Sequence, residues 1–135
     1  MKKIIISFIC AITFAGCSGL NYHEQNQIRQ LQEQGVTVDR PVGSYEKPAS
    51  GVAAAALNLL PGFGNFYLGT GAGAESIHIL YGALNLLFWP LAIIWSVPEA
   101  AIDAENINKR EMLYYYTYNE KGKQELKQAG ITLSK

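Results

Sequence analysis

The stretch that decides the fold is PASGVAAAALNLLPGFGNFYLGTGAGAESIHILYGALNLLFWPLAIIWSVP, residues 48–98. Glu75 is its only charged residue. A helix that faces water on one side shows a polar stripe with a 3.6-residue period. Residues 53–60 and 83–97 are instead apolar nearly all round. Such helices are buried in a large core or in a bilayer, and a chain of 135 residues is too short to build that core. The pattern therefore predicts a membrane-embedded middle.

Turn signals divide this stretch into two helical segments. The first covers residues 50–68, with Ser50 as N-cap and a break at residues 60–64, where Pro61 removes a backbone donor. The glycine-rich residues 69–73 form a turn. The second segment covers residues 74–95, close to the ~20 residues that span a bilayer, with a kink expected at Pro90. We therefore expect a two-helix membrane hairpin over residues 50–97.

The same stretch carries a family resemblance. The motif residues are Pro61, Gly62, Gly64, Phe66, Tyr67, Leu68 and Gly69, followed by an apolar helix and a trailing Asp103. Over residues 52–103 this pattern resembles the TM2-type membrane hairpin, although Asn65 stands where that family often carries His or Gln. The resemblance implies a membrane hairpin and no particular activity, because the family has no common one.

The first residues predict export. Lys2 and Lys3 precede an apolar stretch at residues 4–14, as in a secretory signal peptide. The junction Ala15-Gly16-Cys17 resembles the bacterial lipobox, which implies cleavage before Cys17 and lipidation of its sulfur. Ser18 stands where an Asp would retain an enteric-type lipoprotein at the inner membrane. We therefore expect a periplasm-facing envelope protein, with the outer membrane slightly favoured over the inner.

The two flanks contain an internal repeat. Each copy is a helix end, a capping glycine and an alternating apolar-Thr-apolar triplet, at residues 30–40 and 125–135. One interpretation is that the similarity is coincidental, because units of a helix, a glycine and a strand are common. The other is that residues 36–38 pair with residues 131–133 as a small two-stranded sheet that closes the flanks into one cap. Ser96 and Glu99 have the spacing of a capping box, which places the start of the last long helix near Val97. On that helix Glu105 and Lys109 have the spacing of an i,i+4 ion pair, and Asn119 can cap a last helix over residues 120–129.

Together these features predict a mainly α fold of four parts. Residues 1–16 are a lipoprotein signal peptide, 17–49 a lipidated N-terminal flank, 50–97 the apolar helical hairpin, and 98–135 a C-terminal helical flank.

No arrangement of residues predicts catalysis, a cofactor or a metal. His23 and His78 are far apart in the chain, and Cys17 is the only cysteine after the expected cleavage site. Positive and negative charges balance, which disfavours nucleic acid as a partner. We expect a non-enzymatic envelope protein that contacts membrane lipid and acts by self-association, as a homo-oligomer, or by binding another envelope protein. The alternative is an oligomeric pathway for ions or small solutes, lined by Asn58, Asn65, Asn85 and Glu75.

Overall fold

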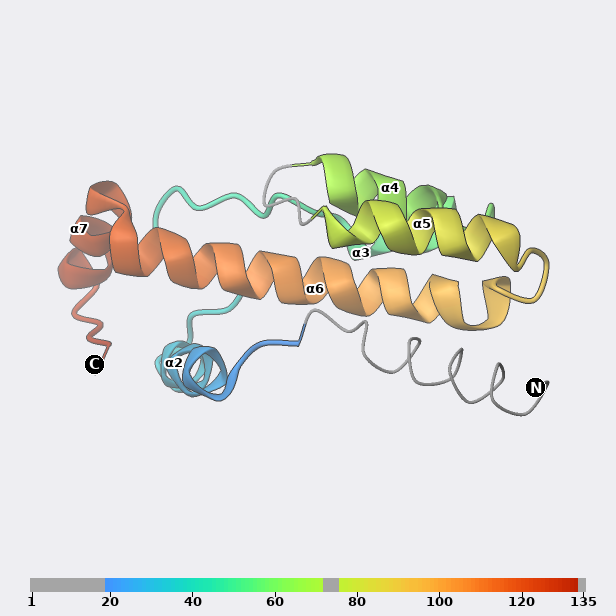
Figure 1. Cartoon of the computed structure of the whole chain (residues 1–135). Coiled ribbons are helices and arrows are strands. Elements are labelled where there is room, and N and C mark those ends of the chain that lie inside the picture. Colours follow the sequence, from blue (N-terminus) through green and yellow to red (C-terminus); the bar gives the residue numbers. More distant parts are fainter. Residues whose placement is uncertain (1–18, 72–75, 134–135) are drawn as a thin grey trace.

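A computed structural model describes residues 19–71 and 76–133 of the chain. Its helices are α2 (Tyr22–Glu33), α3 (Gly51–Leu57), α4 (Phe63–Thr70), α5 (Ile77–Leu87), α6 (Ile93–Tyr118) and α7 (Glu120–Gln128). Figure 1 shows α6 as the long axis of the molecule, with α3, α4 and α5 along one half and α2 and α7 at the other. We call residues 49–71 and 76–107 the bundle, and residues 19–48 and 108–133 the cap.

Side-chain caps determine where three of the helices begin. Asn21 and Glu24 form a reciprocal capping box at the start of α2. The Ser50 hydroxyl accepts from the Ala53 amide, and Asn119 accepts from two amides at the start of α7. Each cap satisfies amides that have no partner within their own helix. The predicted caps Ser50 and Asn119 are confirmed.

The expected membrane hairpin of residues 50–97 is wrong. That stretch forms three short helices and the first turn of α6, and among the described residues no helix is long and apolar enough to cross a membrane. The chain reverses after α3, and it turns again between Phe88 and Ala92, where a single kinked helix was expected. The resemblance to the TM2-type hairpin therefore does not hold for this fold.

The expected sheet between residues 36–38 and 131–133 is also wrong, because the described residues contain no strand. Thr37 instead turns back and forms an isolated bridge with Arg40. The two segments do approach each other. The Gln34 side chain donates to the Thr132 carbonyl and accepts from its amide, at 3.0 and 3.3 Å. A side-chain amide therefore provides the link that a backbone ladder was expected to provide.

The predicted start of the last long helix near Val97, with Ser96 as its cap, is wrong as well, because α6 begins at Ile93. The Ser96 amide donates to the Ala92 carbonyl at 2.9 Å, so this serine already lies inside α6. The predicted ion pair between Glu105 and Lys109 is confirmed at 2.6 Å.

The cap has an apolar core of the usual kind. Its buried residues are Ile28, Leu31, Val36, Tyr45, Met112, Leu113, Tyr116 and Leu126. Ile131 and Leu133 pack against this cluster, so both flanks of the chain fold into one unit. The bundle is built differently, and this difference defines the candidate site.

Candidate functional site: a polar interior under an apolar surface

The interior of the bundle is organised around Asn58, which is fully buried at the end of α3. Its Oδ1 accepts from the amides of Gly62 and Gly64 at 3.1 and 2.7 Å. Its Nδ2 donates to Asn65 Oδ1 and to the Ser96 carbonyl at 2.8 and 2.7 Å. One side chain thus closes the α3–α4 turn and joins it to α4 and α6.

Two further residues extend this network to α5. Asn85 Nδ2 donates to Asn65 Oδ1 at 3.1 Å, and Trp95 Nε1 donates to Asn85 Oδ1 at 3.0 Å. Asparagines therefore connect all four helices of the bundle within one chain. The alternative function proposed from the sequence, an oligomeric pathway for ions or small solutes, placed Asn58, Asn65 and Asn85 along that pathway. In the structure their side chains instead form hydrogen bonds with one another.

The expected motif residues meet at this network and make helix packing possible. Gly62 has a φ of +94°, and a Cβ there would strike the Gly82 backbone. A Cβ on Gly64 would strike the Ala54 carbonyl, and one on Gly69 would lie 2.7 Å from Ile79. Glycine is therefore needed where α4 crosses its neighbours.

The other motif residues surround this crossing. Pro61 is buried in the α3–α4 turn, and Phe66 lies against Gly82. Tyr67 accepts from the Ser50 amide at 3.1 Å, and Leu68 is buried in a cluster with Ala54 and Ala100. Asp103 reaches the interior from α6. Cys17, the expected lipidation site, lies outside the described residues.

Titratable side chains of α5 and α6 also lie in the interior of the bundle. His78 and Asp103 are both fully buried, with 3.6 Å between His78 Nδ1 and Asp103 Oδ2. Burial lowers the pKa of His78, and the charge of Asp103 acts in the opposite direction. One turn before Asp103 on α6, burial raises the pKa of Glu99 to about 7, with a further contribution from Asp103. The bundle thus contains carboxyl and imidazole groups that favour their neutral forms. Among the described residues, no three side chains of His, Cys, Asp or Glu form a metal site.

The surface of the bundle is rich in large apolar side chains. Its exposed large side chains are Val52, Leu57, Leu59, Leu60, Phe63, Ile77, Ile79, Leu80, Leu86, Leu87, Phe88, Trp89, Leu91, Ile94, Trp95 and Ile102. Val52, Leu87 and Ile94 are each more than three quarters exposed, at 83%, 77% and 77%. By contrast, the exposed large hydrophobic side chains among the described cap residues are all tyrosines, at positions 22, 114 and 118.

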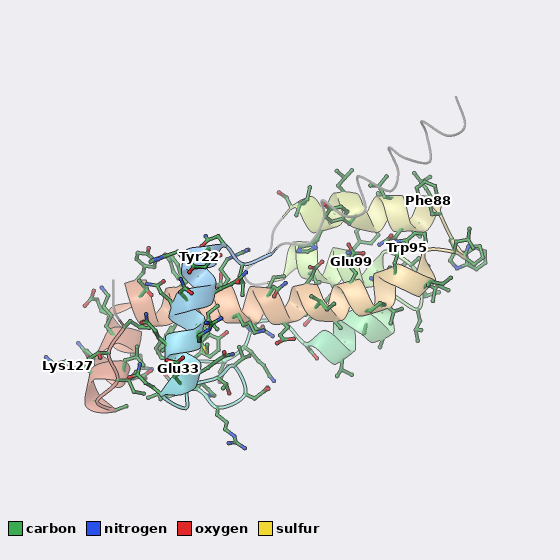
Figure 2. All side chains as sticks on the ribbon, turned by 90° about the horizontal axis from the view of Figure 1, so that it is seen from below. Tyr22, Glu33, Phe88, Trp95, Glu99 and Lys127 are labelled. Carbon is green, nitrogen blue, oxygen red and sulfur yellow. The ribbon has the colours of Figure 1, made fainter. Side chains whose placement is uncertain are left out.

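The most apolar part is the end of the bundle distant from the cap. The turn between α5 and α6 forms this end in Figure 1, and the α3–α4 turn lies beside it because Asn58 bonds to Ser96. Figure 2 shows Phe88 and Trp95 toward this end, Glu99 farther along α6, and Tyr22 and Lys127 in the cap. We call residues 57–63 and 86–95 the tip. The tip carries no charged residue.

A groove runs beside α6, between α3 and the loop that leads into it, with a volume of about 930 Å³. Residues of the bundle form its floor, and cap residues close one end of it.

Comparison with known proteins adds no relative: no model of a protein family, no curated protein and no solved structure matches the chain. The function therefore has to be inferred from the geometry and chemistry of the bundle itself.

Sequence reasoning missed the role of the asparagines. The available signal was that each of them stands alone among apolar residues, as in Leu57-Asn58-Leu59 and Leu84-Asn85-Leu86. A side-chain amide buried among apolar residues requires hydrogen-bond partners. In this stretch the other asparagine side chains are available as such partners.

Proposed function

We propose that this protein is a non-enzymatic, lipid-anchored component of the bacterial envelope. In this proposal the bundle is immersed in one leaflet of the membrane and the cap is held at the aqueous surface. The observation that supports it is the inverted bundle, which has amides, His78 and Asp103 inside and large apolar side chains outside.

The inversion favours lipid as the surroundings of the bundle. Apolar surface in water costs about 25 cal/mol per Å², and monomeric proteins in water rarely expose large continuous apolar patches. In lipid this cost vanishes, while polar groups have to find partners inside the protein. The Asn58 network supplies such partners, and it fills the hydrogen-bonding capacity of the Asn58 side chain.

Helix length favours one leaflet. With a rise of about 1.5 Å per residue, the 11 residues of α5 measure about 16 Å. The hydrocarbon layer of a bilayer is about 30 Å thick, so α5 matches one half of it. The tip then lies near the middle of the bilayer, and Glu105, about 18 Å along α6 from Ile93, lies near the level of the headgroups.

The expected lipid on Cys17 is compatible with this orientation. Leu20 packs against the cap core. Cys17 stands three residues before it in the sequence. One anchoring signal alone gives weak attachment, and a second makes it stable. The acyl groups and the tip would therefore act together, and the cap would be the part that meets another envelope protein.

The test uses Cys17→Ala protein, which lacks the lipid, mixed with vesicles of phosphatidylethanolamine and phosphatidylglycerol. We expect the protein to float with the vesicles. Lipids brominated deep in their acyl chains should quench its tryptophan fluorescence more strongly than lipids brominated near the headgroup. Leu87→Lys at the tip should weaken flotation at least tenfold, whereas Tyr118→Lys in the cap is the matched control and should leave it unchanged.

Two results would contradict the proposal. One is a Cys17→Ala protein that stays monodisperse and free of vesicles. The other is equal loss of flotation in the tip and cap variants, because the attachment would then not depend on the apolar surface.

A further inference from the structure

The groove beside α6 has an apolar floor. Val52 and Ala56 of α3 and Leu59, which follows that helix, line it on one side, and Val97 and Ala101 of α6 line the other. Ala56 and Leu59 are exposed, so no other part of the described chain covers them. The volume of about 930 Å³ lies within the range of small-molecule sites, about 300–1,000 Å³.

Charges are confined to the end of the groove next to the cap. They are Asp39, Lys47, Glu105 and Lys109. They form two ion pairs, Lys47 with Asp39 and Lys109 with Glu105, each at 2.6 Å. Three of these four side chains are about half exposed or more, and only that of Lys109 is less exposed, at 24%. Exposed ion pairs contribute little to stability, so their partners can be exchanged for those of a ligand.

The gradient from apolar to charged runs along α6. Leu59 and Val97 lie toward the tip, and Glu105 and Lys109 lie toward the cap. Twelve residues separate Val97 from Lys109, a rise of about 18 Å. This is close to the thickness of one leaflet, about 15 Å, together with the start of its headgroup layer. The groove therefore has the polarity and the length of a single membrane lipid.

We propose that this groove binds one phospholipid with a zwitterionic aminoethyl-phosphate headgroup. One acyl chain lies along the apolar floor. The phosphate pairs with Lys47 and Lys109, and the ammonium group pairs with Glu105 and Asp39. This inference rests on the proposed function, because it requires the bundle to stand in the leaflet with its tip inward.

The charge balance selects the headgroup. The four charged side chains sum to zero, as do the phosphate and ammonium groups of the lipid. An anionic lipid would satisfy the lysines and leave Asp39 and Glu105 facing a negative charge. A second copy of the chain would offer no such pairing unless it presented both charges at the same spacing.

The test is native mass spectrometry of the detergent-solubilised, lipidated protein, titrated with dioleoylphosphatidylethanolamine or dioleoylphosphatidylglycerol. We expect one phosphatidylethanolamine to bind per chain, about tenfold more tightly than phosphatidylglycerol. Ala56→Trp should fill the floor and abolish this binding. Leu60→Trp is the matched control, because Leu60 is exposed on the same apolar surface and does not line the groove.

Charge variants test the headgroup separately from the acyl chain. Asp39→Asn with Glu105→Gln should reverse the preference in favour of phosphatidylglycerol, because two uncompensated lysines remain. Lys47→Gln with Lys109→Gln should weaken the binding of both lipids.

Three results would overturn the inference: several lipids bound without preference, binding that survives Ala56→Trp, or a dimer that Ala56→Trp dissociates. Vesicle flotation separates this inference from the proposed function. If flotation of the Cys17→Ala protein persists and selective binding is absent, only the lipid site fails, whereas loss of that flotation removes both.

Discussion

The cap and the bundle share one helix, α6, and differ in what they bury and expose. The bundle buries a small apolar cluster that includes Ala54 and Leu68, but its interior also holds a network of asparagines. In the cap, Leu31 and Met112 are buried and the charged side chains face outward. In the bundle, Asn58 and Asp103 are buried and Leu87 and Ile94 face outward. Burying apolar side chains stabilises a protein only when the alternative is water. This contrast supports the proposal that the two halves of the molecule stand in different surroundings, and substitutions in each half can test that proposal.

The largest effect is expected from Asn58→Leu, which keeps the branched shape of the side chain and removes its polar atoms. The amides of Gly62 and Gly64 lose their partner, whereas Asn65 Oδ1 keeps its bond from Asn85. Each unsatisfied buried group costs about 1–3 kcal/mol, so the free energy of unfolding should fall by about 2–6 kcal/mol. Denaturant titration in detergent measures this. A variant as stable as the parent would mean that the bundle does not depend on its polar interior.

A pair of leucine truncations compares the two halves directly. Leu31→Ala in the cap should lower the free energy of unfolding by about 2–5 kcal/mol, because Leu31 is completely buried. Leu87→Ala at the tip should change it by no more than about 0.5 kcal/mol, because its side chain is mostly exposed. Leu87→Ala should instead weaken vesicle binding. The contrast fails if both variants lose the same stability.

Glu99 should make the stability of the bundle depend on pH. Its pKa in the folded protein is raised to about 7 from a reference value of 4.5, so the folded state binds the proton more tightly than the unfolded state. The stabilisation that the protonated Glu99 carboxyl gives to the folded state is therefore fully present below pH 4.5 and is lost as the pH rises through about 7. His78 acts in the opposite direction, because burial lowers its pKa and acid favours the unfolded state.

Comparison with Glu99→Gln isolates the carboxyl group. As the pH rises from 5 to 8, the melting temperature of the parent should fall relative to that of Glu99→Gln. Thermal unfolding in detergent, followed by circular dichroism, measures it. A difference that is independent of pH would show that Glu99 titrates normally in the folded protein.

The smallest effect is expected in the cap, at Glu125. Its carboxylate accepts from the Ser44 amide and hydroxyl and from Tyr115 Oη, which ties α7 to the loop before the bundle. Desolvation raises the pKa of Glu125, but these hydrogen bonds outweigh it and lower the pKa overall. The stabilisation is thus present above pH 4.5 and is lost as the pH falls through the lowered value.

We expect Glu125→Gln to increase amide hydrogen exchange in α7 and to leave the bundle unchanged. Lys127→Gln on the same helix is the control, since Lys127 is exposed. Equal exchange in the parent and in Glu125→Gln would show that this contact does not hold α7.

Local features of the fold could be predicted from the sequence, and its long-range arrangement could not. Ser50 and Asn119 determine helix starts by contacts within a few residues, so their roles follow from the sequence alone. The hairpin prediction failed because hydropathy does not report where the chain reverses. The Asn58 side chain that closes the reversal after α3 also bonds to the Ser96 carbonyl, 38 residues away, and no local pattern reports that contact.

The candidate site was predictable to a similar extent. The motif glycines were correctly located at a break in the apolar stretch, and their contacts with Ala54, Gly82 and Ile79 required the fold. The expected sheet failed because Thr37 forms a tight turn with Arg40, although its alternating pattern also suits a strand. Lipidation of Cys17 stays a prediction.

The length of α6 gives the molecule a lever arm. At about 1.5 Å per residue, its 26 residues form a rod about 39 Å long whose first turns belong to the bundle and whose last turns belong to the cap. A tilt of about 10° at the tip would move the α7 end sideways by about 7 Å, by simple trigonometry on that length. In the proposed placement of the bundle in a leaflet, this rod would convert a change in leaflet thickness or tension into a displacement of the cap.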